Sequence, residues 1–312
     1  MNRSILLRLR IAFVLTFAVL ITAPVAGQDS PGLGAGTQAS NATAVKNPAT
    51  RFYKIRLNSK ATMQMQGQTQ QIDADTTVGY HRSGPDPQNR VDVGLDAINV
   101  KATVNGATQI DSFQSKEKLI VVQGGQTQTV LAKDAEAPLQ QMLQDTFGSP
   151  ACRLTLDENG EIVHNESLLR PGAKSIEDQG IVANILFFHA PFTTDAKSWT
   201  SVRKVSMGNG GFVEGELTYS PKSNDGARHV VDVSGTLKNP RFQPAGTPLQ
   251  LRDTAYEISG SQVYDTDLGD WVSGNLTAEL KYDMFVNDMP VGKVTGTIVL
   301  TLSQLDEAVS NP

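Results

Sequence analysis

Apolar and polar residues alternate with a period of two along most of the chain from Arg51 onward. One stretch places its less polar side chains at every second position, with Asp, Thr or Gly between them: Ile72, Ala74, Thr76, Val78 and Tyr80. Such alternation is typical of a β-strand that buries one face and exposes the other. A similar stretch runs from Tyr53 to Met65, so the two predict an antiparallel hairpin around Gly67.

Tight-turn signals separate further strands. Asn105-Gly106 follows an alternating run over 98–104, and this dipeptide favours a hairpin because both residues tolerate a positive φ. The longest alternating pair, 274–282 and 294–302, flanks a second turn signal at Asn287-Asp288. Shorter strands are predicted at 91–95, 119–122, 127–131, 154–156, 162–163, 213–219, 231–237, 263–264 and 271–272.

Two segments depart from this period and show helical spacing. Over 135–147, apolar residues recur every three or four positions, and Pro138 stands in the first turn, where proline is tolerated. Over 175–190, the run 181–188 is apolar on almost every side, and Pro191 ends the segment. A helix of that kind is buried nearly all round. We therefore expect it to lie against the concave face of a sheet.

Together these patterns predict a mainly β protein with two helices. The expected architecture is a large curved antiparallel sheet, or half-β-barrel, that encloses helices or is covered by them. Residues 50–305 are predicted to form one such domain, followed by a tail over 306–312.

The first residues carry the pattern of an export signal. A basic start with Arg3, Arg8 and Arg10 precedes an apolar run over 11–21, and small residues follow up to Gly27. Residues 1–27 are thus predicted to be a cleaved signal peptide, which predicts a periplasmic or extracellular location with no stable membrane span after cleavage. Residues 28–49 are rich in small and polar types and are predicted to be a flexible leader.

The net charge and the cysteine content argue against nucleic-acid binding and against an internal disulfide. The formal net charge is −5, and it becomes −8 without residues 1–27, which hold three Arg and no acidic residue. Such a surface has no basic field for nucleic acid. Cys152 is the chain's one cysteine, so it cannot form an internal disulfide, and it is predicted to be a small buried apolar residue.

No catalytic constellation emerges from the sequence. The four histidines, His81, His164, His189 and His229, are not spaced as metal ligands. There is no Gly-x-Ser-x-Gly elbow and no phosphate-binding loop. The chain is therefore predicted to be non-enzymatic and to need no cofactor.

One oxygen-rich cluster has two interpretations. Asp265, Asp267 and Asp270 follow each other closely enough to chelate Ca²⁺ from one turn. However, the glycine position and the missing distal Glu depart from the EF-hand loop. A solvated hairpin turn is the other interpretation, and it is the one that we favour; no metal site is predicted.

Two strand–Asp–turn–Gly–strand units, at 152–162 and 260–271, and the closing hairpin carry a family resemblance. The chain resembles the half-β-barrel lipoprotein-carrier superfamily of the periplasm, and a related exported bacterial family of unknown function. The resemblance implies an incomplete, twisted barrel that is covered by helices and encloses an apolar cavity for acyl chains. The resemblance assigns no functional residue to this chain.

The alternation then indicates which side chains would face such a cavity. The candidates from the sheet and the second helix are Met63, Met65, Val78, Leu186, Phe187, Phe188, Leu276 and Leu280. Two hypotheses remain open. In the first, the chain binds a lipid or another apolar ligand there. In the second, these residues fill the core, and the chain is a structural or protein-interaction module of the cell envelope with an envelope protein as partner.

Overall fold

The computed structural model describes residues 50–65, 67–123, 125–147, 149–157, 162–169, 181–193, 197–208, 211–244 and 247–309. The predicted signal peptide over 1–27 and leader over 28–49 lie outside the described residues. Within the described part, none of the helices combines the length and the apolar character needed to cross a membrane.

The described residues form one antiparallel sheet of fourteen strands. The strands are β1 (Arg51–Met65), β2 (Gln68–Ser83), β3 (Arg90–Val104), β4 (Ala107–Ser115), β5 (Lys118–Gln123), β6 (Gln126–Leu131), β7 (Pro150–Leu156), β8 (Ile162–Ser167), β9 (Trp199–Gly208), β10 (Gly211–Asp225), β11 (Arg228–Phe242), β12 (Leu249–Asp265), β13 (Asp270–Val286) and β14 (Met289–Leu305). Their order is β6-β5-β4-β3-β2-β1-β14-β13-β12-β11-β10-β9, while β7 pairs with β3 and β8.

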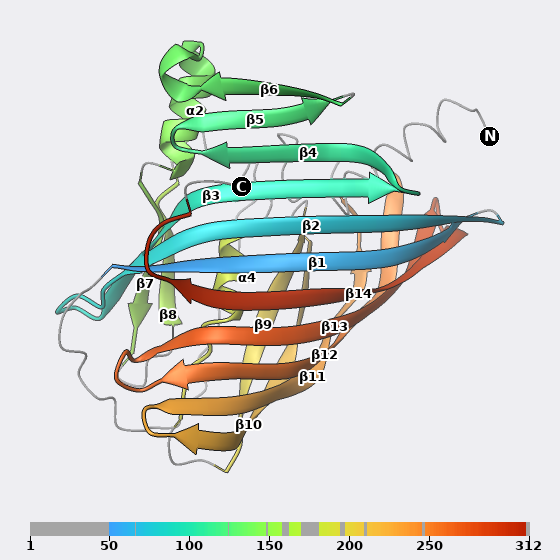
Figure 1. The fold of residues 1–312 in the computed structure, drawn as a ribbon. Coiled ribbons are helices and arrows are strands. Elements are labelled where there is room, and N and C mark those ends of the chain that lie inside the picture. Colours follow the sequence, from blue (N-terminus) through green and yellow to red (C-terminus); the bar gives the residue numbers. More distant parts are fainter. Residues whose placement is uncertain are drawn as a thin grey trace.

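The sheet is curved and does not close, since β6 and β9 end it without pairing with each other (Figure 1). The predicted fold class is therefore confirmed. The predicted hairpins are confirmed as well, including the turn at Asn105-Gly106, where both residues have a positive φ. Asn287-Asp288 closes β13 onto β14 with the same backbone conformation.

The first and last strands of the sheet pair with each other. In the register of β1 and β14, Ile55 lies opposite Leu302 and Met63 lies opposite Val294. This pairing joins the N-terminal meander to the C-terminal one. One contiguous cluster of buried apolar side chains, from Tyr53 on β1 to residues of β14, crosses the junction.

Two helices accompany the sheet in the described residues. α2 (Ala137–Phe147), preceded by the 3₁₀ turn η1 (Ala132–Asp134), lies beside β3 and β4. α4 (Ile181–Phe187) lies in the hollow of the sheet, behind the central strands in Figure 1. The first helix agrees with its predicted range.

The second helix is shorter at its end than the predicted 175–190. It stops at Phe187, because Pro191 disfavours helical backbone before it and the last turn tightens into 3₁₀-type bonds. The N–H of Phe188 donates to the carbonyl of Ile185, and that of His189 to the carbonyl of Leu186. The predicted start falls at 175–180, outside the described residues.

Part of the predicted tail packs on the outside of the sheet. Residues 306–309 run back over β1 and β2 (Figure 1). A Cβ on Gly79 would come within 2.7 Å of the Cβ of Val309, so only glycine leaves room for this contact. Residues 310–312 lie outside the described part.

Candidate functional site

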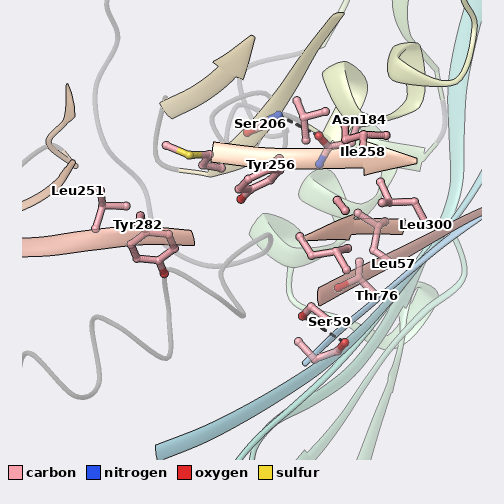
Figure 2. A pocket seen from close by; sticks show the side chains of 15 residues that line it. Leu57, Ser59, Thr76, Asn184, Ser206, Leu251, Tyr256, Ile258, Tyr282 and Leu300 are labelled. Carbon is pink, nitrogen blue, oxygen red and sulfur yellow. Dashed lines mark hydrogen bonds between the residues drawn. The ribbon is translucent and has the colours of Figure 1, made fainter. Parts of the chain in front are cut away.

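An apolar cavity of about 90 Å³ opens on the concave face of the sheet. Side chains of the central strands face those of α4 and β9 across it (Figure 2). Its lining consists of Leu57, Ser59, Ala74, Thr76, Asn184, Val205, Ser206, Met207, Leu251, Tyr256, Ile258, Ala278, Tyr282, Ile298 and Leu300. The hollow is continuous with solvent on one side.

Small side chains create this hollow. One row of cross-strand neighbours runs over β2, β1, β14, β13 and β12 as Ala74, Ser59, Ile298, Ala278 and Ile258. Three of the five are Ala or Ser, so their side chains stop short of the elements that pack above the sheet. Space remains where a Leu in the same place would fill it.

The opposite wall is fixed by a hydrogen bond between α4 and β9. The backbone N–H of Ser206 donates to the Oδ1 of Asn184 at 3.0 Å, and both residues are buried. This bond satisfies a backbone group that α4 would otherwise cover. The bond fixes α4 and β9 relative to each other within this wall.

Two phenols complete the lining. Burial raises the pKa of Tyr256 to about 12. Burial also raises the pKa of Tyr282 well above its ordinary value, with a smaller effect from Tyr256. Both rings are therefore neutral at physiological pH, so they add amphipathic but uncharged surface.

None of the eight predicted cavity residues lines this cavity. Met63, Val78, Phe187, Phe188, Leu276 and Leu280 are buried and belong to the contiguous core. Met65 and Leu186 are half-buried. Leu276 and Leu280 lie two positions on either side of Ala278 and therefore share its face of β13. Large side chains fill the interior, and the cavity lies where small ones leave it empty.

A second feature, which the sequence reasoning missed, is a buried charged network at one end of the sheet. Its centre is Asp270, at the start of β13 and 6% exposed. Tyr53 donates its hydroxyl proton to Oδ2 of Asp270 at 2.7 Å, and Arg82 donates from Nη1 to Oδ1. His189 Nδ1 lies 3.1 Å from Oδ1 of Asp270, and its Nε2 lies 2.8 Å from the hydroxyl of Tyr80.

Ionisation in this network follows from burial and charge. Burial alone would raise the pKa of Asp270, but Arg82 and the bonds from His189 and Tyr53 hold it well below its usual range. Burial, helped by the positive charge of Arg82, lowers the pKa of His189 to about 4. At neutral pH the network thus contains a carboxylate, a guanidinium and a neutral imidazole.

The Asp cluster does not act as one chelating turn. Asp265 Oδ1 accepts the backbone N–H groups of Asp267 and Leu268 at 3.1 Å each, which shapes the turn. Asp270 instead points into the network of Arg82 and His189. Among the described residues, no three or more His, Cys, Asp or Glu side chains are grouped so as to hold a metal ion.

The described residues offer no activated nucleophile at either feature. Cys152 is buried, as predicted, and burial raises the pKa of its thiol to about 12. Burial also raises the pKa of Tyr53 and of Tyr80 well above the ordinary range. Proton transfer from any of these groups at neutral pH is unfavourable.

Comparison with known proteins gives fold likeness only. No protein-family model matches the sequence, and no curated protein sequence matches it. A structure described as lipid–protein interactions in lipovitellin aligns with 86% of this chain and 26% of its own, at 13% identity and a TM-score of 0.46. This chain thus spans about a quarter of that protein.

Two further solved structures are similar at lower scores. DynF from the dynemicin biosynthesis pathway of Micromonospora chersina aligns over 91% of this chain and 92% of its own, at 9% identity and a TM-score of 0.23. OccK5 of Pseudomonas aeruginosa aligns over 84% and 100%, at 8% identity and a TM-score of 0.23. The function is therefore inferred from the geometry of this chain alone.

Proposed function

We propose that the chain binds an apolar ligand, such as a fatty acyl chain, on the concave face of its open sheet. The apolar cavity beneath α4 and β9 is the observation that carries this proposal. Its lining is mostly aliphatic, and its tyrosines stay neutral. Burial of apolar ligand surface in such a site is favourable by roughly 25 cal/mol per Å².

The volume limits how the ligand would bind. An apolar cavity of about 150 Å³ takes up a benzene molecule, and this one has about 90 Å³. The cavity therefore suits the end of a chain, with the rest lying along its open side. Small adjustments of Met207, an adaptable side chain in the lining, would extend it.

The alternative function, a structural envelope module, is less well supported. That hypothesis required a filled core, whereas the row around Ser59 and Ala278 leaves open space. We further propose that the protein is exported and acts without catalysis. The pattern of residues 1–27 supports export, and the raised pKa of the Cys152 thiol supports a binding role over a nucleophilic one.

Replacement of Ala278 by Leu tests the proposal. Ala278→Leu adds three carbon atoms inside the cavity and excludes a similar length of ligand. Each buried CH₂ is worth about 0.8 kcal/mol, so binding of a fluorescent fatty acid should weaken at least about tenfold. Native mass spectrometry of gently purified protein would show co-purifying lipid in the natural chain and less in the variant.

The matched control is Asn275→Leu, on the same strand but on its exposed face. It should bind the fatty acid as the natural chain does. Circular dichroism would establish that both variants are folded. Failure of the natural chain to take up fatty acid, or equal uptake by Ala278→Leu, would contradict the proposal.

A further inference from the structure

A second cavity, of about 100 Å³, lies at the end of the sheet where the buried network sits. Arg82, His189 and Asp270 line it on one side. Tyr264 and Ile162, both half-buried, also line it. This cavity is unlike the first in that charged and polar groups make up much of its wall.

The guanidinium of Arg82 uses only one of its three nitrogens within the described residues. Nη1 donates to Oδ1 of Asp270 and lies 2.8 Å from Nδ1 of His189. Nε is buried and has no hydrogen-bond partner. Nε is closed off from the cavity, whereas Nη2 makes no hydrogen bond within the described residues. A carboxylate or phosphate beside Arg82 would therefore accept a hydrogen bond from Nη2.

Positive charge exceeds negative charge around the cavity. Arg82 and Arg51 both lie close to Asp270, with Nη1 of Arg51 3.7 Å from its Oδ2. Arg203 is buried as well, has Nε and Nη2 without partners, and contributes to the lowered pKa of His189.

The acidic groups nearby are already paired. Both oxygens of Asp270 accept hydrogen bonds, from Tyr53 at Oδ2 and from Arg82 and the backbone N–H of Trp271 at Oδ1. Asp265 lies opposite Asp270 in the register of β12 and β13, and its Oδ2 is 3.6 Å from Nε of Arg228. A buried surplus of positive charge is costly unless an anion balances it.

We propose that this second cavity binds a small anion bearing a carboxylate or phosphate group, held by Nη2 of Arg82. The anion would balance the charge that Asp270 leaves uncompensated. The volume of about 100 Å³ suits a single such group and not a large molecule.

This anion is a separate ligand and not the head group of the apolar one. On β1, Leu57 lines the apolar cavity and Tyr53 belongs to the charged network, with fully buried Ile55 between them. Leu302 lies beside Ile55, and the ring of Phe188 lies over the next position, Gly274. These apolar residues form a layer that separates the two cavities.

Isothermal titration with inorganic phosphate and with acetate tests the proposal on the purified chain. We expect saturable binding of at least one of them. Ile162→Glu would place a like charge at the cavity without touching the network, and it should weaken binding at least about tenfold. Val163→Glu is the matched control, because Val163 is 58% exposed and points away on the same strand. It should change binding less than about twofold.

A further variant and a competition experiment with oleate complete the test. Arg82→Lys keeps the charge beside Asp270 but removes the separate donor Nη2, and it should weaken binding about tenfold even when the variant is folded. Binding of phosphate in the presence of saturating oleate supports a free anion as the ligand. Displacement of phosphate by oleate, absence of saturable binding to either anion, or equal loss in Val163→Glu and Ile162→Glu would overturn the proposal.

Discussion

At the scale of single residues, His189 makes the fold sensitive to acid. Its pKa is about 4 in the folded chain, compared with about 6.5 for an exposed histidine. Between these values the unfolded chain binds more protons, so stability falls as the pH drops from about 6.5 to 4, by on the order of 3 kcal/mol. Asp270, whose pKa is lowered by folding, adds to the loss only below its ordinary titration range.

Thermal denaturation measured from pH 7 to pH 4 checks this expectation. His189→Gln removes the titrating group, so its melting temperature should be lower at pH 7 but should depend less on pH. His164→Gln, at an exposed position on β8, is the control and should keep the pH dependence of the natural chain. A natural chain whose stability is flat down to pH 4 would contradict the assignment of a neutral, buried His189.

Residue types alone predicted part of the site region. The burial of Cys152 was predicted because a free cysteine behaves as a small apolar side chain, and it is confirmed. The predicted ligand residues are large side chains such as Leu280, whereas the cavity lies beside small ones such as Ala278, which leave room. The network escaped prediction because Tyr53 and Asp270 are 217 positions apart. A histidine directly after an apolar run was the one available signal.

At the scale of elements, glycines inside strands permit the curvature. Gly260 in β12 has a φ of 147°, and a Cβ there would lie 2.2 Å from the carbonyl oxygen of Asn275. Gly260→Ala should therefore destabilise the protein by about 3 kcal/mol or more, since it adds both backbone strain and a clash with backbone. Urea denaturation measures this loss.

A turn glycine provides the comparison. Gly106 has a φ of 78°, and nothing lies within 4 Å of a Cβ built on it. Gly106→Ala should cost only about 1 kcal/mol, from the left-handed backbone alone. Equal losses of unfolding free energy in the two variants would show that the close approach at Gly260 does not affect stability.

Strands were predictable wherever alternation was clean, as in β1, β2, β13 and β14. β9 and the first half of β12 were missed because polar residues occupy buried positions there. On β9 the buried residues include Arg203 and Ser206, while Val202 is 62% exposed. On β12 buried Thr254 interrupts the apolar face. Tertiary packing overrides the residue pattern in both strands.

At the scale of the whole molecule, the order of the strands in the sheet could not be predicted from the sequence. Local turns fix which consecutive strands pair, and several of those pairs were predicted, such as β1 with β2 and β13 with β14. The pairing of β1 with β14 joins residues at opposite ends of the domain, and no turn specifies it. Whether the sheet closes depends on strand twist summed over all strands, which no single segment encodes. Curvature was predicted correctly from the need to cover an apolar helix.

On the proposed function, the open cavity trades stability for binding. If the space around Ala278 served no ligand, filling it would be favourable, since cavity-filling substitutions commonly add about 0.5–2 kcal/mol. Without ligand, Ala278→Leu should therefore melt about 2–4 °C higher for each kcal/mol gained.

Saturating oleate should raise the melting temperature of the natural chain, because it binds only the folded state. It should raise the melting temperature of Ala278→Leu less, because binding is weaker there, while Asn275→Leu should follow the natural chain. An equal shift with oleate in both Ala278→Leu and the natural chain would mean that the ligand binds elsewhere, and the empty space would then need another explanation.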